Sequence, residues 1–182
     1  NAGQLETVID RAVAQQVRLL VTPELSVTGY TCADLFAQRT LGDRVKSALD
    51  TLAAESAGCG VAFAVGAPVV MSGSLYNCAV VFFGGRVVGI VPKTFIPNYG
   101  EFYEMRQFTP GPDRARYISF AGEQIPFGPQ LLFQAEAMEE LVVAAEICED
   151  VWSPVPPSIQ AALEGATVIV NCSASDETIG KD

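Results

Sequence analysis

Apolar runs recur along the chain, and they constrain its fold more than any other feature of the sequence. A run that is apolar throughout, without polar alternation, indicates a strand covered on both faces. Gly84-Gly85 separates two of the runs and favours a tight hairpin, because both glycines accept positive φ. The sequence therefore predicts an α/β fold with mixed sheets in a layered sandwich and helices outside. The runs are 19–21, 61–70, 76–83, 86–91, 131–133, 141–147 and 167–171.

The segments between the runs predict helices and one long loop. Apolar residues recur at helical spacing from Leu5 to Val17, and again from Leu35 to Leu52, after which glycines end the pattern. A short helix is expected over 158–164. The stretch 92–128 is rich in proline, glycine and aromatic residues with little periodicity, which is typical of a functional loop.

Size and charge limit the classes of function. A chain of 182 residues with 49% hydrophobic residues predicts one domain, 1–182, with a well-buried core. A net charge of -10 argues against nucleic acid and anionic membranes as partners, because phosphate binding needs clustered lysine and arginine. No membrane-spanning segment or signal peptide is expected. The abrupt ends of the sequence suggest a fragment of a longer chain.

The cysteines indicate reduced thiols. Their number is odd and their spacing irregular, which favours a cytoplasmic protein without disulfides. Histidine and CxxC pairs are both absent from the sequence, so no zinc or other metal site is predicted. The five are Cys32, Cys59, Cys78, Cys148 and Cys172.

Three reactive side chains each follow an apolar run. Glu24 comes after 19–21, Lys93 after 86–91 and Cys148 after 141–147. Side chains at the ends of neighbouring strands meet on one rim of a sheet, so we expect these three to lie together. Without histidine, a carboxylate or a lysine has to take the proton of the thiol. Taken singly, Glu24 and Lys93 also fit solvated residues and Cys148 an inert core thiol, since neighbouring acids disfavour its thiolate.

The passages around these residues resemble the nitrilase superfamily of carbon-nitrogen hydrolases. Within it, the chain is most similar to the glutaminase domains of glutamine-dependent NAD synthetases. The resemblance implies a nitrilase-like αββα sandwich, incomplete at both ends, that forms part of a longer chain. The passages are 23–30 with Asp34-Leu35-Phe36, 92–104, and 146–152 with Pro154 and Pro156-Pro157.

The resemblance implies hydrolysis of L-glutamine through a thioester. Cys148 would attack the amide carbonyl, Glu24 would act as general base and Lys93 would support the oxyanion. The ammonia would serve a synthetase domain of the same parent chain, which amidates nicotinic acid adenine dinucleotide. That domain would bind ATP and Mg, whereas no cofactor is expected for residues 1–182. A homo-oligomer is also implied.

The resemblance further implies a set of substrate-binding residues, for most of which an alternative stays open. Glu104 matches a second glutamate that orients the site. Tyr30 and Trp152 fit the core equally well, Glu149 fits a helix-start acid, and Ser175 fits a turn cap. The full set is Tyr30, Tyr99, Glu104, Glu149, Trp152 and Ser175.

Two other functions fit the same passages. One is a free-standing amidase or carbamoylase of the superfamily, with the same chemistry on another substrate. The other is a catalytically silent scaffold that keeps the fold, which predicts an unreactive Cys148.

Overall fold

The computed structural model describes residues 1–175 and residue 180. Within this part of the chain, α-helices and short 3-10 helices alternate with two groups of strands. None of these helices is long and apolar enough to cross a lipid bilayer. The α-helices are α1 (Ala2–Ala14), α2 (Arg39–Glu55) and α3 (Pro157–Leu163), and the 3-10 helices are η1 (Ala33–Ala37), η2 (Glu104–Arg106) and η3 (Cys148–Trp152).

The strands form a six-stranded and a three-stranded sheet, both mixed. The larger sheet has the order β1-β2-β3-β4-β6-β5 and the smaller one β7-β8-β9. The first sheet comprises β1 (Leu19–Val21), β2 (Ala62–Met71), β3 (Ser74–Phe83), β4 (Arg86–Pro92), β5 (Arg116–Phe120) and β6 (Glu123–Phe127). The second comprises β7 (Leu132–Ala135), β8 (Met138–Ile147) and β9 (Val168–Cys172).

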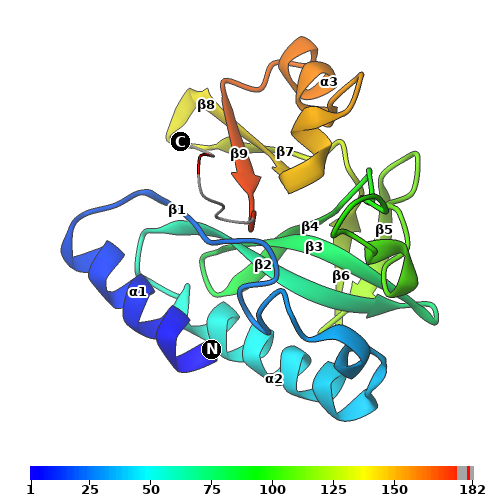
Figure 1. The fold of residues 1–182 in the computed structure, drawn as a ribbon. Helices are drawn as coiled ribbons and strands as arrows, with labels where there is room; N and C mark the ends of the chain where they lie inside the picture. The colour runs from blue at the N-terminus through cyan, green and yellow to red at the C-terminus, as the bar shows by residue number, and fades with distance from the viewer. Residues whose placement is uncertain (176–179, 181–182) are drawn as a thin grey trace.

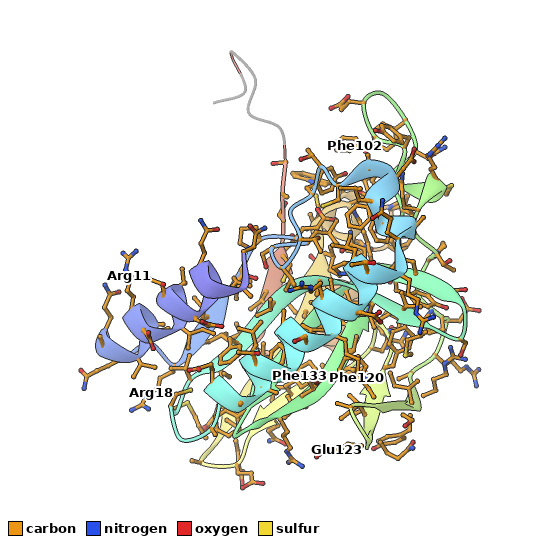
Figure 2. The ribbon with its side chains drawn as sticks, turned by 90° about the horizontal axis from the view of Figure 1, so that it is seen from below. Arg11, Arg18, Phe102, Phe120, Glu123 and Phe133 are labelled. Atoms are coloured by element: carbon orange, nitrogen blue, oxygen red, sulfur yellow. The ribbon has the colours of Figure 1, made fainter. Side chains whose placement is uncertain are left out.

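The elements stack in four layers (Figure 1). Helices α1 and α2 cover one face of the six-stranded sheet, the smaller sheet packs on the other face, and α3 lies outside it. Figure 2, seen from the helix side, shows α2 lying across the large sheet while Arg11 and Arg18 extend outward beside α1. This arrangement confirms the predicted αββα sandwich with mixed sheets.

Two cores hold the layers together. Between α2 and the large sheet lie buried side chains such as Leu52, Phe63 and Phe82. Between the two sheets lie mostly small ones, among them Ala79 and Ala145. Small side chains allow close approach of two sheets, so the ends of strands from both sheets reach the same region.

Strand directions explain which ends meet. β1 runs parallel to β2, and β2, β3 and β4 alternate in direction, so β1 and β4 point the same way. Their carboxyl ends therefore lie on one rim of the large sheet. In the small sheet, β8 and β9 also run parallel. Glu24, Lys93 and Cys148 follow β1, β4 and β8 respectively.

The structure corrects the predicted long loop over 92–128. Residues 116–127 form the β5–β6 hairpin at the edge of the large sheet, around a turn at Ala121-Gly122 where both residues have positive φ. The prediction is wrong there because these short strands are half polar. β5 is an edge strand, with Tyr117 73% exposed, so it lacks the continuous apolar run of the central strands.

Both predicted N-terminal helices have different limits. α1 ends at Ala14, and Gln16 adopts a positive φ of 58° that turns the chain before Val17. The second predicted helix is two elements, because Leu35 and Phe36 lie in η1 and α2 starts at Arg39. An extended Gln38 separates them.

Candidate active site

Glu24 is held in a compact turn after β1. Thr22 and Ser26 bond to each other through their hydroxyls, and Thr22 Oγ1 also accepts the backbone N–H of Gly66 in β2. Ser26 Oγ and the N–H of Val27 both donate to the carbonyl of Gly66. The turn is therefore fastened to the middle of the large sheet, and Glu24 is 2% exposed.

Lys93 places a fully buried ammonium between two carboxylates. Its Nζ lies 2.7 Å from Glu24 Oε1, 2.9 Å from Glu104 Oε1 and 3.0 Å from Glu104 Oε2. A buried charge is stable only when it is paired and hydrogen-bonded, and here both conditions are met. Glu104 starts η2, so the long segment after β4 folds back to supply the second carboxylate.

Neutral side chains complete this cluster. Asn77 in β3 is fully buried and donates from Nδ2 to Glu24 Oε1 at 2.6 Å. Tyr30 donates its hydroxyl to Glu104 Oε1 at 2.7 Å. Glu24 Oε1 thus accepts two hydrogen bonds, whereas its buried Oε2 has no partner among the described residues. One oxygen of Glu24 is left able to accept a proton.

Charge and burial act differently on the pKa values of Glu24 and Lys93. Burial raises the pKa of Glu24, and Lys93 only partly offsets this. Burial lowers the pKa of Lys93, but the two glutamates raise it by more, so the ammonium stays charged. A carboxylate with a raised pKa is a stronger base, which suits proton abstraction near neutral pH.

Cys148 sits on a sharp turn at the end of β8. It has a φ of 43°, a left-handed conformation that a side chain with a Cβ rarely adopts, and it is half-buried. Asn171 of β9 brackets it: Oδ1 accepts the N–H of Cys148 at 3.0 Å, and Nδ2 donates to its carbonyl at 3.4 Å. These bonds hold the backbone of the turn that carries the thiol.

The thiol of Cys148 lies within electrostatic reach of both Glu24 and Lys93. Burial raises its pKa, Glu24 raises it further, and Lys93 lowers it. Hydrogen bonds from the Ser173 side chain and the Ala174 backbone also lower it, because they stabilise the thiolate. The net effect keeps the group as a thiol at neutral pH, so nucleophilic attack requires a base nearby.

The acids adjacent to Cys148 in the sequence do not govern its titration. Glu146 Oε2 accepts the N–H of Ser158 at the start of α3. Glu149 accepts the hydroxyl of Tyr99 at 2.8 Å on each oxygen. Asp150 accepts backbone N–H groups. The carboxylate that raises the pKa of Cys148 is Glu24, which is distant in sequence.

The remaining predicted site residues lie farther out. Tyr99 and Glu149 pair with each other near the surface, with Tyr99 59% exposed. Trp152 is 79% exposed, so the alternative that it belongs to the core is wrong. Ser175 is exposed as well, and the serine that reaches Cys148 is Ser173, two residues earlier.

Sequence reasoning missed several residues around the site. Asn77, Asp150 and Asn171 look like ordinary polar residues in or next to strands. The usable signal for Asn77 and Asn171 is their place within apolar runs, since a polar side chain in a covered strand needs a specific partner. Ser173 follows β9, which runs parallel to β8, so its position at the same end of the sheet as Cys148 could have been predicted.

The cluster has the parts for acyl transfer from an amide or nitrile. It combines a nucleophile, a base with a free oxygen and a fixed cation able to stabilise a developing oxyanion. Among residues 1–175 and 180, no group of three histidine, cysteine or acidic side chains is arranged to hold a metal ion. All five cysteines, including Cys148, are free thiols.

Known proteins share this sequence and fold. The chain is 43% identical over 183 residues to the glutamine-dependent NAD(+) synthetase of Mycobacterium tuberculosis, covering 99% of this chain and 27% of that protein. The structure of a glutamine-dependent NAD(+) synthetase from Cytophaga hutchinsonii superposes with a TM-score of 0.85 at 29% identity, over 99% of this chain and 28% of the other. An amidase from Nesterenkonia sp. shares the fold, with a TM-score of 0.73 at 23% identity, over 98% of this chain and 60% of the amidase.

The relatives and the family comparison agree with the geometry. The chain spans only about a quarter of the length of the synthetases it matches, so the likeness concerns one region of those proteins. The family model of the carbon-nitrogen hydrolases matches residues 1–182, which is the whole sequence. With this match and the sandwich that carries the cysteine, glutamate and lysine cluster, the chain belongs to the carbon-nitrogen hydrolase family.

Proposed function

We propose that this chain is the glutaminase region of a glutamine-dependent NAD synthetase. It hydrolyses L-glutamine to glutamate and ammonia, and a synthetase domain of the same parent chain uses the ammonia to amidate nicotinic acid adenine dinucleotide. The observation that carries the proposal is the buried ion cluster of Glu24, Lys93 and Glu104 acting on the strained Cys148. The identity to several such synthetases supports the choice of substrate.

The reaction proceeds in two halves. In the first, Glu24 Oε2 takes the proton of the Cys148 thiol, the sulfur attacks the side-chain amide carbon, and Lys93 stabilises the negative oxygen. The proton on Glu24 then passes to the leaving nitrogen, which departs as ammonia and leaves a thioester. In the second half, Glu24 removes a proton from water, which attacks the thioester and releases glutamate and the thiol.

Each protein group in this scheme has a position that supports its role. Lys93 cannot act as the base, because two carboxylates hold its proton. Glu104 neutralises Lys93 from the other side and leaves Glu24 able to exchange protons. The exposed pair of Tyr99 and Glu149 offers an acidic contact for the α-amino group of glutamine near the thiol. We further propose that Trp152 and Ser175 contact the substrate and that the parent protein is a homo-oligomer.

The test is to replace Cys148 with alanine in the full-length protein. The Cys148→Ala variant should lose synthesis of NAD from glutamine, and keep synthesis from added ammonia, because ammonia bypasses this site. Cys59→Ala is the matched control, since Cys59 lies between α2 and β2, where its thiol donates to the carbonyls of Ser56 and Val61. Equal glutamine-dependent activity in Cys148→Ala and Cys59→Ala would contradict the proposal.

A further inference from the structure

Asp150 is a buried acid that accepts three backbone hydrogen bonds from two separate strand ends. Its Oδ1 accepts the N–H of Thr94 at 3.0 Å and of Phe95 at 2.8 Å. Its Oδ2 accepts the N–H of Ile147 at 3.0 Å. The side chain is 1% exposed. Both oxygens are therefore occupied, each on a different segment of the chain.

These two segments carry the cation and the nucleophile of the site. Thr94 and Phe95 directly follow Lys93 after β4, and Ile147 directly precedes Cys148 after β8. β4 and β8 belong to different sheets, so no ladder of backbone hydrogen bonds joins them. The carboxylate of Asp150 is a direct polar link between the residues that flank Lys93 and Cys148.

We propose that Asp150 is a positioning residue that sets the distance between the Cys148 turn and Lys93. The proposal rests on the proposed function, in which the sulfur and the ammonium act on the same carbonyl group. Asp150 touches neither the thiol nor the ammonium directly, and acts through the backbone of their neighbours. An error of about 1 Å in such a distance can lower a rate by about 100-fold.

The two neighbouring acids do not share this arrangement. Glu149 pairs with an exposed tyrosine and contacts no backbone group among the described residues. Glu146 accepts from the backbone of Ser158 in α3 and from the side chain of Asn171 in β9, and neither belongs to the large sheet. Of the three acids, Asp150 alone joins the two sheets within the described residues.

The environment of Asp150 argues against a role in stability alone. Burial raises the pKa of its carboxyl to about 6, even though the three N–H groups and Lys93 oppose the shift. A group whose ionised form is disfavoured in the folded state stabilises the fold less than a neutral one of the same shape. The ionised carboxylate is nevertheless the form with two acceptor oxygens, which both segments require.

The test compares conservative variants in the full-length protein. Asp150→Asn keeps the size but has one acceptor oxygen instead of two, so one of the two segments loses its partner. We expect kcat for glutamine hydrolysis to fall by about 10- to 100-fold with KM within about threefold of wild type. Asp150→Glu, which keeps the charge but moves the oxygens by one methylene, should lower kcat in the same way.

Two control variants separate positioning from folding. Asp43→Asn makes the same chemical change at an exposed acid on α2 and should leave kcat unchanged. Val45→Ala opens a cavity in the core beneath α2 and lowers the melting temperature without touching the site. A kcat within about twofold of wild type in folded Asp150→Asn or Asp150→Glu would overturn the proposal. So would a fall in kcat that Val45→Ala reproduces at an equal melting temperature.

A second measurement separates a failure of the proposed role of Asp150 from a failure of the proposed function. Alkylation of Cys148 by a chloroketone analogue of glutamine needs the thiol and its surroundings but no synthetase domain. If wild type releases no ammonia from glutamine, the proposed function fails. If wild type is active and Asp150→Asn hydrolyses and reacts at the wild-type rate, only the role of Asp150 fails.

Discussion

Replacing Gly66 with alanine should displace Glu24, the proposed general base, without altering any polar group. Gly66 lies in β2 under the turn that carries Glu24, and a Cβ built there comes 2.3 Å from the carbonyl oxygen of Pro23. It also comes 2.5 Å from the nitrogen of Leu25 and 2.8 Å from the carbonyl carbon of Glu24. All three atoms belong to the backbone, so no side-chain rotation relieves the contact.

The size of the effect follows from these distances. An ordinary contact between carbon and oxygen is about 3.3 Å, so the turn has to retreat by about 1 Å. Overpacking of this kind typically costs about 1–3 kcal/mol of stability. The same movement separates Glu24 from Cys148 and Lys93, for which we expect a fall in kcat of about 100-fold.

The assay is ammonia release from glutamine by the full-length protein, beside denaturant unfolding of the same samples. Gly42→Ala is the matched control, because it adds the same methyl group in α2 with Val70 Cγ2 4.0 Å away as its nearest contact. As a helix-interior change, it should stabilise the protein by up to about 1 kcal/mol and leave kcat unchanged. Activity of Gly66→Ala within about threefold of wild type would refute the claim that this turn requires a residue without a side chain at position 66.

Three further predictions concern the charges of the site. Lys93→Met leaves two buried carboxylates without their cation, so the free energy of unfolding should fall by about 3–5 kcal/mol in urea titrations, and a loss below about 1 kcal/mol would contradict this account of the ion cluster. Tyr30→Phe removes a hydrogen bond to ionised Glu104 at a half-buried position, which should lower the free energy of unfolding by about 1–2 kcal/mol, and an unchanged value would mean that water replaces the hydroxyl. Burial and Glu24 raise the pKa of the Cys148 thiol above its ordinary value, so its thiolate fraction still grows with pH in the alkaline range. Iodoacetamide should therefore react with Cys148 at a rate that keeps increasing above about pH 8.5, the ordinary pKa of a cysteine, whereas a plateau below about pH 8 would show an activated thiolate instead.

The sequence predicted the architecture of the site better than its fine structure. Apolar runs identified β1, β4 and β8, and the rule that strand ends converge placed the residues after them in one region. The rule does not supply the order of strands. β1 and β4 have β2 and β3 between them, and only the alternating directions within the sheet show that their ends share a rim.

The residues that sequence reasoning missed act on backbone atoms. Asp150 appeared only as a third negative charge beside Cys148, whereas two of its three partners, the N–H groups of Thr94 and Phe95, lie more than 50 residues away. Asn171 appeared only as the end of a strand, yet it holds a turn 23 residues earlier. Such bonds depend on tertiary distances that local periodicity does not encode. Gly66 likewise lies inside the predicted run 61–70 with no sequence signal of its role, although the structure shows a backbone segment occupying the space that a side chain would take.

The wide sequence separation of the cluster has a consequence for how the protein matures. Lys93 and Glu24 are 69 positions apart in the sequence, and α3 lies between Cys148 and its partner Asn171. Long-range pairings of this kind form late, after local hairpins and helices. A newly synthesised chain therefore has neither the carboxylate of Glu24 nor the ammonium of Lys93 beside Cys148 until both sheets have docked.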